Sequence, residues 1–546
     1  MRGTMMEYPL TLSSLLERAE RLFGDVEIVS RRPDRSLARS HYAEFTRRAR
    51  ALADALTRAG LQRGDRVATL MWNNAAHLEA YFGIPAAGGV LHTLNLRLHA
   101  DELAYIANHA EDRFLIVDDV LLPVLEAFRD KVKFERIWVH PFSGEANLAP
   151  AFDSYESLLG SATGDFRLPA LDENEAAAMC FTSGTTGKPK GVMYSHRALV
   201  LHSLAEAMPD AFAFSQRDTV MCVSSMFHAN GWGYPFSAVM VGAKLVFVGP
   251  HADPEGLLDL MEQERVTLTN GVPTIWIGIL EALEKNPGRW KLRPGLRAAG
   301  AGTAMPESVI RGLDKHGISI VHLWGMTETT PLATSSTLCA AMEGWSDDQK
   351  YAVRATQGRP MPLVDLRAMS GGKEVPWDGK TIGELQVRGP WVAGSYHNFL
   401  ESQNRWTDDG WFDTGDVVTI DPHGYIRITD RSKDLIKSGG EWISSVDVEN
   451  ALMGHPAVRE AAVVGVPHPK WQERPLAVVV CRDGKGPCDP TSEGALCDAL
   501  RQFLAAKFAK WQLPDAFVFV GEIPKTSVGK FLKTKLREQY RDWKWV

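Results

Sequence analysis

The chain has 546 residues, of which 45% are hydrophobic and 23% are charged, and its formal net charge is −7. A single hydrophobic core rarely serves so long a chain, so we expect a globular protein with two or more domains. Positive and negative residues are intermixed, and no basic stripe is present. This balance argues against a nucleic-acid partner.

The cysteines and the N-terminus bear on location. Six cysteines stand far apart, without a Cys-x-x-Cys pair, at positions 180, 222, 339, 481, 488 and 497. That spacing indicates neither a zinc site nor a disulfide framework, and it fits a reducing compartment. Residues 1–7 have no apolar signal core, and no stretch approaches the ~20 apolar residues that span a bilayer. We expect a cytoplasmic protein without a transmembrane segment.

From about residue 65 to 325, short apolar runs alternate with helical patterns. The runs are 66–71, 176–181, 219–224, 244–248 and 318–323, and the helical patterns lie near 75, at 254–264 and at 306–315. This βα rhythm predicts an α/β fold, with parallel sheets covered by helices. Ligands are expected at the carboxyl ends of the strands, where Thr182 and Trp324 fall.

The pattern then changes twice. From 359 to about 429, short β segments such as 383–388 and 424–428 are separated by Gly, Pro and Asp, which predicts a small β-barrel-like subdomain. After 430 a shorter α+β pattern begins. It consists of a helix at 445–453, strands at 461–466 and 476–480, a helix at 492–508, a strand at 516–520 and a C-terminal helix.

The segment 182–191 reads Thr-Ser-Gly-Thr-Thr-Gly-Lys-Pro-Lys-Gly and follows the apolar run 176–181. Glycines let backbone N–H groups approach a polyanion, hydroxyls add donors, and lysines add charge. The segment is not a Walker A loop, because proline rather than Ser or Thr follows the first lysine. A polar linker has a similar composition. The phosphate-binding interpretation assigns Thr182, Ser183, Gly184, Thr185, Thr186, Gly187, Lys188 and Lys190.

Further motifs decide between these alternatives. In order, they are Gly-Val-Pro-Thr at 271–274, Trp-Gly-Met-Thr-Glu-Thr at 324–329, Gly-Glu-Leu-Gln-Val-Arg-Gly at 383–389, Trp-Phe-Asp-Thr-Gly-Asp at 411–416, Asp-Arg-Ser-Lys-Asp at 430–434 and Pro-Lys-Thr-Ser-Val-Gly-Lys at 524–530. Each is weak alone. The ordered set resembles the adenylate-forming superfamily of acyl-CoA synthetases, peptide-synthetase adenylation domains and beetle luciferases.

The resemblance implies a domain organisation and a reaction. Residues 1–429 would form the N-terminal adenylation domain, with its β-barrel-like part at about 359–429, and residues 430–546 a mobile C-terminal domain. A carboxylate is a poor electrophile, so the superfamily uses ATP and Mg2+ to convert it into an acyl-adenylate and pyrophosphate. Attack by the coenzyme A thiol then gives acyl-CoA and AMP. We therefore expect an ATP-dependent acid:CoA ligase.

Four residues would have catalytic roles. The resemblance makes Glu328 a Mg2+ ligand, Thr327 a hydroxyl donor to the α-phosphate, and Thr182 part of the phosphate loop. Lys530 would bridge the carboxylate and the α-phosphate during adenylation. Outside the ordered set, Thr-Glu-Thr is more often a helix cap and a lysine after Val-Gly is usually exposed.

The nucleotide would lie between two motifs. Asp416 resembles the aspartate that accepts hydrogen bonds from the ribose hydroxyls, and Arg431 its basic partner. Trp324, beside Gly325, is expected to pack on adenine, with the backbone of Gly300, Ala301 and Gly302 opposite. The C-terminal domain would then rotate about Asp430 and present a pantetheine tunnel. The residues implied there are Gly439, Gly440, Glu441 and Trp442, while Lys433 and Lys437 are candidates for steadying nucleotide or phosphate groups.

The sequence says less about the residues that would bind the acid substrate. Residues 227–233 are similar to the acyl-pocket segment of medium- and long-chain fatty acyl-CoA synthetases, which makes Trp232 a gate and His228 a residue that orients the carboxylate. Core packing explains either residue about as well. Medium- or long-chain fatty acids lead as substrates, a short thioether acid such as methylmercaptopropionate or an aryl acid is the alternative, and loading of a carrier protein is a remoter one. A homodimer is also implied.

Overall fold

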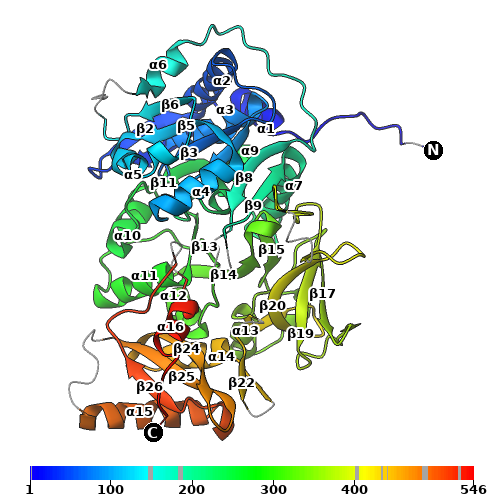
Figure 1. Ribbon diagram of the computed structural model, residues 1–546. Coiled ribbons are helices and arrows are strands. Elements are labelled where there is room, and N and C mark those ends of the chain that lie inside the picture. The colour runs from blue at the N-terminus through cyan, green and yellow to red at the C-terminus, as the bar shows by residue number, and fades with distance from the viewer. Residues whose placement is uncertain are drawn as a thin grey trace.

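The computed structural model describes residues 1, 3–144, 152–182, 188–399, 405–431, 434–438, 441–482, 490–526 and 530–545, with the backbone alone at 431, 441, 490 and 491. These residues form four β-sheets. In Figure 1 two helix-covered sheets occupy the upper and middle parts of the molecule, an antiparallel sheet lies to the right, and the C-terminal sheet lies at the bottom.

The first sheet has seven strands in the order β7-β6-β5-β3-β4-β8-β9, parallel except for β9. Its strands are β3 (Arg66–Leu70), β4 (Val90–Thr93), β5 (Asp112–Asp118), β6 (Arg136–His140), β7 (Asp153–Ser154), β8 (Ala176–Phe181) and β9 (Gly191–Ser195). The helices between and beside them are α2 (Tyr42–Arg58), α3 (Ala75–Ala86), α4 (Ala100–Ala110), α5 (Leu122–Glu126), α6 (Tyr155–Gly160) and α7 (His196–Ala207). The phosphate-loop segment therefore joins two neighbouring strands at one end of this sheet.

The second sheet has nine strands in the order β16-β15-β14-β13-β12-β10-β11-β1-β2. They are β1 (Glu27–Arg31), β2 (Leu37–His41), β10 (Thr219–Cys222), β11 (Lys244–Phe247), β12 (Leu268–Gly271), β13 (Leu296–Gly300), β14 (Ile318–Gly325), β15 (Leu332–Ser335) and β16 (Arg359–Pro360). Its helices include α1 (Leu12–Leu22), α9 (Tyr234–Val241), α10 (Pro254–Gln263), α11 (Pro273–Lys285), α12 (Glu307–Lys315) and α13 (Asp347–Arg354).

Two smaller sheets complete the fold. An antiparallel sheet in the order β18-β17-β19-β20-β21 stands where the β-barrel-like subdomain was expected. Its strands are β17 (Asp365–Ser370), β18 (Lys373–Glu374), β19 (Gly383–Arg388), β20 (Phe412–Ile420) and β21 (Ile426–Arg431). The C-terminal sheet contains β22 (Ile436–Ser438), β23 (Glu441–Ile443), β24 (Val458–His468), β25 (Gln472–Cys481) and β26 (Ala516–Phe519), with α14 (Ser445–Met453), α15 (Pro490–Ala505) and α16 (Lys533–Gln539). The predicted fold class is confirmed, while the boundary at 429/430 stays a prediction.

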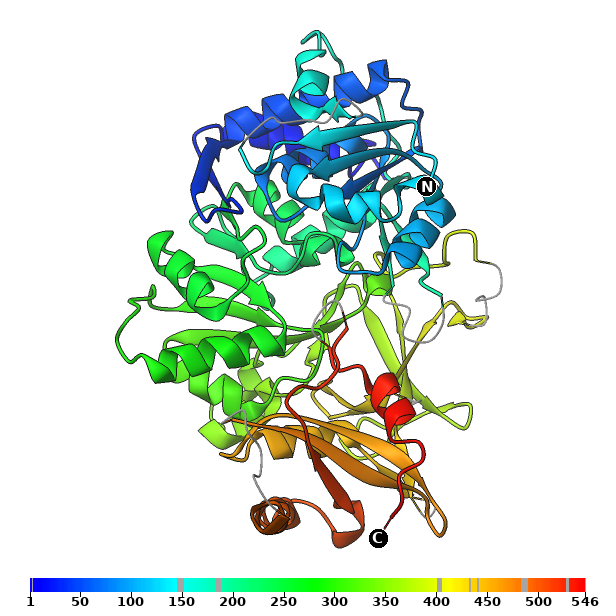
Figure 2. The same ribbon diagram turned by 60° about the vertical axis from the view of Figure 1, so that its left-hand side comes forward.

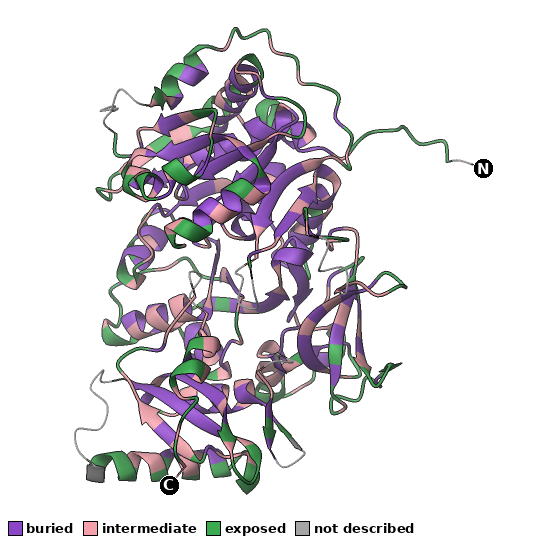
Figure 3. Cartoon of the chain, in the orientation of Figure 1, coloured by how far each residue is buried: buried purple, intermediate pink, exposed green. Residues whose placement is uncertain are grey.

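The core follows from the apolar runs. All four residues of β4 and of β12 are buried, as expected for parallel strands with helices on both faces. Figure 3 shows this as purple strands beneath helices with green outer faces. Helix starts are set by side-chain caps, for example Asn74 on α3 and Ser444 on α14. No helix among the described residues is long and apolar enough to cross a membrane.

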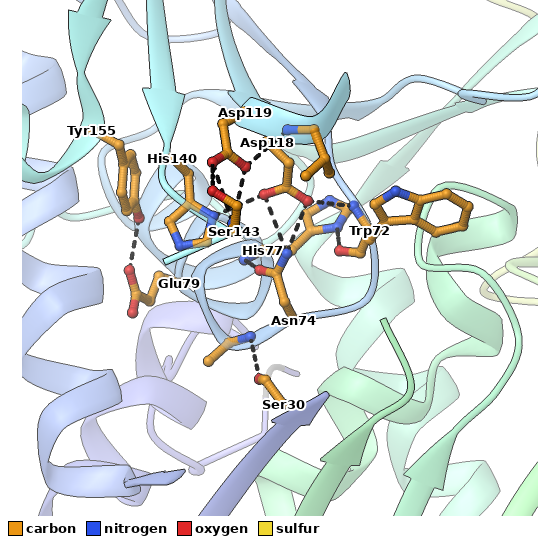
Figure 4. A network of polar contacts seen from close by, with 12 residues as sticks. Ser30, Trp72, Asn74, His77, Glu79, Asp118, Asp119, His140, Ser143 and Tyr155 are labelled. Atoms are coloured by element: carbon orange, nitrogen blue, oxygen red, sulfur yellow. Dashed lines mark hydrogen bonds and ion pairs between the residues drawn. The ribbon is translucent and has the colours of Figure 1, made fainter. Parts of the chain in front are cut away.

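A buried polar network fixes the connection between β3 and α3 (Figure 4). Asp118, at the end of β5, is fully buried, and its carboxylate accepts hydrogen bonds from Trp72 N (2.8 Å), Asn74 Nδ2 (3.0 Å) and His140 Nδ1 (2.8 Å). Burial raises the pKa of Asp118, and the His140 hydrogen bond opposes that shift. The network holds the connection between β3 and α3 at the carboxyl edge of the first sheet.

Burial of His202 predicts a pH dependence of stability. Burial lowers its pKa from 6.5 to about 3, and its Nε2 accepts a hydrogen bond from Leu332 N at 3.1 Å. Below pH 6.5 the unfolded chain binds a proton that the folded chain does not, so this stabilisation is present above pH 6.5 and is lost as the pH falls towards 3.

We expect His202→Gln to reduce the steepness with which the free energy of unfolding falls between pH 6.5 and 4.5, by up to about 1.4 kcal/mol per pH unit. Denaturant unfolding at several pH values measures this. The exposed His99 provides the control variant His99→Gln, which should behave as the wild type does. Equal slopes for His202→Gln and the wild type would contradict the assignment.

Candidate active site

A cavity of about 210 Å³ lies where three of the four sheets approach one another. Its walls include the ends of β13 and β14, strand β20 and the segment before α16. Five of the predicted site residues line it: Gly302, Trp324, Gly325, Asp416 and Lys530. In Figure 2 the red segment before α16 rises from the C-terminal sheet towards the green strands of the second sheet.

Lys530 reaches across from the C-terminal part of the chain. A β-carbon on Gly302 would lie 3.4 Å from Lys530 Cε, and Gly302 has a left-handed φ of +101°. The lysine sits in a tight hairpin, because Thr526 N donates to Lys530 O (2.7 Å) and Lys530 N donates to Thr526 Oγ1 (3.1 Å). Glycine at position 302 therefore leaves room for the lysine chain against the backbone.

His228 faces the same region. Burial, and then the positive charge of Lys530, lower the pKa of His228 to about 3, so its imidazole is neutral at physiological pH. His228 also lines a small hollow of about 10 Å³ together with Thr182. The structure thus brings the predicted acyl-side histidine close to the C-terminal lysine and to the start of the phosphate loop.

The phosphate loop and the Thr-Glu-Thr motif meet through Tyr396. The hydroxyl of Tyr396 donates to Glu328 Oε1 at 2.5 Å, and the ammonium group of Lys190 lies 4.8 Å from the centre of the Tyr396 ring. Glu328 is 5% exposed and lies in the short turn η3 (Thr327–Thr329). Tyr194 secures this turn by donating to Thr327 O at 2.7 Å. The sequence motifs did not include either tyrosine.

The base of the phosphate loop is closed by a pair of hydrogen bonds. Thr182 N donates to Lys190 O (2.9 Å), and Lys190 N donates to Thr182 Oγ1 (3.1 Å). Burial lowers the pKa of Lys190, and the neighbouring Glu328 opposes that shift. The ammonium group of Lys188 lies 5.3 Å from the centre of the Tyr105 ring. Residues 183–187 of the predicted loop, Ser183, Gly184, Thr185, Thr186 and Gly187, lie outside the described residues.

Two residues expected to bind the nucleotide are joined by a hydrogen bond. Trp324 Nε1 donates to Asp416 Oδ2 at 2.8 Å, and both residues are buried. A β-carbon on Gly325 would overlap the carbonyl oxygen of Pro331, which explains glycine there. Of the three residues expected opposite Trp324, Gly302 lines the cavity, whereas Gly300 and Ala301 do not line it. The backbone of Arg431 pairs with Asp416 across β21 and β20.

The residues expected at the pantetheine tunnel, and the two lysines expected at nucleotide or phosphate groups, are not found in the cavity where the structure describes them. Lys437 and Trp442 pair across the β22–β23 hairpin, with the lysine ammonium 5.4 Å from the centre of the indole ring, and neither lines the cavity. Trp442 is 45% exposed. Lys433, Gly439 and Gly440 lie outside the described residues, and only the backbone of Glu441 is described. The structure therefore brings Gly302, Trp324, Gly325, Asp416 and Lys530 to one cavity and leaves Lys437 and Trp442 outside it.

The acyl segment, residues 227–233, has an unusual backbone conformation. Ala229, Asn230 and Trp232 have φ values of +38°, +39° and +60°, and Gly231 and Gly233 are also left-handed. Asn230 N donates to Cys180 Sγ (3.2 Å), which ties the segment to β8. A run of left-handed residues that includes alanine and tryptophan is strained, so surrounding contacts must impose it.

Two asparagines impose the path into this segment. Asn73 Nδ2 donates to Cys222 O (3.0 Å) and Ser224 O (2.9 Å), and Met226 N donates to Asn73 Oδ1 (2.8 Å). Asn270 Oδ1 accepts from Val223 N and from Ser224 N. Asn73 follows β3 in the first sheet, and Asn270 lies in β12 of the second sheet. The acyl segment is therefore anchored at the junction of the two sheets.

Comparisons with known proteins agree with this geometry. A family model described as AMP-binding enzyme matches residues 16–397, and one described as AMP-binding enzyme C-terminal domain matches residues 447–530. The chain belongs to the AMP-binding enzyme family. The predicted membership of the adenylate-forming superfamily, as an acyl-CoA synthetase, is confirmed.

Several curated relatives match the chain from end to end. A long-chain-fatty-acid–CoA ligase of Thermus thermophilus is 49% identical, over 99% of this chain and 97% of its own. A 3-methylmercaptopropionyl-CoA ligase of Ruegeria lacuscaerulensis is 44% identical, covering 99% of both chains, and a medium-chain-fatty-acid–CoA ligase of Ectopseudomonas oleovorans is 44% identical over 99% and 98%.

Solved structures share the fold. ATP-bound MatB of Rhodopseudomonas palustris has a TM-score of 0.81 at 27% identity, over 98% of this chain and 99% of its own. The o-succinylbenzoate CoA synthetase MenE of Bacillus subtilis, in complex with ATP and magnesium, has a TM-score of 0.77 at 23% identity, over 96% and 99%. The second likeness concerns the fold alone.

The contact between Tyr396 and Glu328 leads to a prediction about magnesium. Mg2+ is usually held by one or two carboxylates together with substrate phosphates and water, and Glu328 is the carboxylate expected to hold it here. We expect Glu328→Gln to raise the Mg2+ concentration for half-maximal adenylation by about tenfold or more, since an amide is a weaker ligand.

Tyr396→Phe should raise the Mg2+ concentration for half-maximal adenylation by about threefold, because the Glu328 carboxylate loses the hydrogen bond that orients it. Tyr351→Phe is the matched control, since Tyr351 donates in the same way to Asp314 Oδ2 (2.8 Å) outside the cavity. Identical Mg2+ titrations for all variants and the wild type would refute the metal-ligand role.

Proposed function

We propose that this acyl-CoA synthetase activates medium- or long-chain fatty acids, with ATP, Mg2+ and CoA as its other reactants. The observation that supports this most directly is Lys530 lying over Gly302 in the cavity that Trp324 and Asp416 also line. A cation there stands beside the nucleotide residues and next to the acyl segment, where an acid and an α-phosphate have to meet.

In the first step a carboxylate oxygen of the acid attacks the α-phosphorus of ATP, and pyrophosphate leaves with the bonding electron pair. Lys530 bridges the carboxylate and the α-phosphate oxygens and neutralises charge that grows in the transition state. Thr327 donates to an α-phosphate oxygen. Thr182, Lys188 and Lys190 hold the departing phosphates, and His228, being neutral, orients the carboxylate by a hydrogen bond without adding charge.

Mg2+ would be held by Glu328 and by phosphate oxygens, and it supplies Lewis-acid stabilisation of the phosphates when bound. Asp416 accepts from the ribose hydroxyls, with Arg431 as its basic partner, and Trp324 packs on the adenine. In the second step the thiol sulfur of CoA attacks the acyl carbonyl, the thiol proton leaves, and AMP departs with the electron pair of the broken bond.

The second step requires a different arrangement of the C-terminal domain. Lys437 and Trp442 lie outside the adenylation cavity, which is the arrangement expected before rotation about Asp430 brings their hairpin to the active site. Gly439, Gly440 and Glu441 would then complete the pantetheine tunnel, and Lys433 and Lys437 would steady nucleotide or phosphate groups. A homodimer and a cytoplasmic location stay predictions from the sequence.

The acid itself needs an experiment. Relatives named for medium-chain fatty acids and for 3-methylmercaptopropionate are equally similar to this chain, at 44% identity. Pyrophosphate release and thioester formation should be measured with fatty acids of increasing length, methylmercaptopropionate and aryl acids, with and without CoA. The proposal requires the highest kcat/KM with a fatty acid, and a preference for methylmercaptopropionate would establish the alternative. Acid-dependent exchange without thioester would refute the ligase function.

Lys530→Ala should lower the rate of adenylation by about a thousandfold or more, because the lost charge acts on the first transition state. Reaction of a supplied acyl-adenylate with CoA should change little. Half-reaction assays measure both steps. Lys535→Ala, at an exposed position in the neighbouring helix α16, is the control and should leave both rates unchanged. Equal losses in both steps of Lys530→Ala would show a structural role instead.

The structure sharpens a test of rotation. Asp430 is buried, and its Oδ2 accepts from Ser445 N (2.9 Å) and Ser445 Oγ (2.5 Å) at the start of α14. Asp430→Pro would fix φ near −65° but would also remove this carboxylate. Asp430→Ala removes the carboxylate alone and is the matched control.

We expect Asp430→Pro to lower the thioester step by about a hundredfold relative to Asp430→Ala, with adenylation affected far less, because only proline restricts the hinge. Fluorescence between labels on the two domains, read upon adding CoA to the adenylate-bound enzyme, should change in Asp430→Ala but not in Asp430→Pro. Gly440→Leu should block the thioester step while still rotating. Wild-type thioester rates in Asp430→Pro and Gly440→Leu would refute rotation.

A further inference from the structure

The hydrogen bond from Trp324 to Asp416 joins two separate sheets. Trp324 is near the end of β14 in the nine-stranded sheet, whereas Asp416 belongs to β20 in the antiparallel five-stranded sheet. The indole N–H donates to Asp416 Oδ2 at 2.8 Å, and the exposed fractions of the two residues are 6% and 2%. A donor in so buried a place meets a carboxylate with little competition from water.

The backbone around Asp416 is also fixed. In the register of β19 and β20, Glu384 pairs with Val417 and Gln386 pairs with Asp413, so residues 414–416 bulge opposite one residue of β19. Gly415, in the middle of the bulge, has a left-handed φ of +71°. Asp416 N donates to Thr414 Oγ1 (3.1 Å), whose hydroxyl donates to Leu385 O (2.8 Å). The bulge places Asp416 in the cavity wall.

The backbone contacts of Asp416 do not by themselves fix the plane of its carboxylate. An aspartate carboxylate rotates broadly about its terminal torsion, so its lone pairs have no single direction of their own. The Trp324 N–H occupies one lone-pair direction of Oδ2 and thereby favours one orientation of the carboxylate, which has about four acceptor directions in total. Phenylalanine offers the same kind of aromatic face without any N–H donor.

We propose that Trp324 is a positioning residue for ribose recognition, and that its N–H sets the selectivity of the site for nucleotides with both ribose hydroxyls. This inference rests on the proposed function, in which Asp416 accepts from the ribose. It gives Trp324 a role separate from packing on adenine. Packing depends on the ring face, whereas selection at the ribose depends on the single N–H.

The two roles predict different results when the N–H is removed. If Trp324 only packs on adenine, Trp324→Phe weakens ATP and its 2′-deoxy and 3′-deoxy analogues by the same factor, so the ratio of their dissociation constants is unchanged. If Trp324 orients Asp416, the substitution selectively removes the affinity that each ribose hydroxyl contributes. The dissociation constant of each deoxy analogue divided by that of ATP then falls towards one.

The test is titration calorimetry of ATP, 2′-deoxy-ATP and 3′-deoxy-ATP binding without acid, so that turnover is not needed. We expect the wild type to bind ATP at least about tenfold more tightly than either analogue, the effect of one hydrogen bond to a charged acceptor. Trp324→Phe should reduce that preference to about threefold or less. Melting temperatures establish that the variant is folded, and Trp324→Leu, which also has no hydrogen-bond donor, replaces it if it is not.

Trp290→Phe is a closely matched control. Trp290 Nε1 donates to Asp259 Oδ1 at 2.7 Å, which is the same indole-to-carboxylate pair outside the cavity, and this variant should keep the wild-type preference. An unchanged preference in Trp324→Phe overturns the inference. A wild type without any preference overturns it together with the ribose role of Asp416, while the acid panel with and without CoA tests the ligase function independently.

Discussion

The proposed adenylation site depends on one positive charge, the ammonium group of Lys530, which neither of the two large sheets provides. The ends of β13 and β14 provide backbone, an aromatic ring and Glu328, and the first sheet contributes the base of the phosphate loop. The ammonium group that completes the cavity comes from Lys530, more than a hundred residues beyond Asp416. Since Lys530 lies in the segment before α16 and in neither of the large sheets, the proposed domain rotation would withdraw its charge without disturbing the elements proposed to hold the nucleotide.

A buried ion pair lies three residues beyond Lys530, at the start of α16. Lys533 Nζ contacts Glu449 Oε1 at 2.7 Å and donates to Ser445 Oγ, the same hydroxyl that donates to Asp430. Burial raises the pKa of Glu449 to about 7, with Lys533 opposing that shift. Asp430, the proposed hinge, and the segment that carries Lys530 are thus connected through Ser445.

Much of the fold is encoded in local pattern. The helix predicted at 445–453 and the strands predicted at 176–181 and 383–388 have exactly those bounds, because apolar periodicity, caps and glycines there agree with the tertiary structure. Elsewhere the observed ends of strands differ from the predicted ends by a few residues. The predicted strand at 424–428, for example, is β21 at Ile426–Arg431, since pairing with β20 rather than composition sets its bounds.

The site was predictable only where a motif carries its residues. Trp324, Asp416, Gly302 and Lys530 fall in the cavity, but Tyr396 follows no motif and is recognisable only once its hydroxyl is seen on Glu328. The sequence also did not predict the left-handed backbone of residues 229–233. Apart from its two glycines and Asn230, the segment contains residues that avoid such φ values, and contacts from distant asparagines fix the chain just before it.

Under the proposed acyl-binding role of this segment, its backbone path limits how the enzyme could acquire a new substrate. A β-carbon at Gly233 would overlap the ring of His202 and lie 2.8 Å from Glu206 Oε2, and one at Gly231 would lie 3.3 Å from the ring of Pro235. Replacing either glycine would therefore disturb a backbone already held in strain. Natural or engineered changes in acid preference should accumulate on the elements that surround the segment, while the segment itself stays nearly constant in sequence.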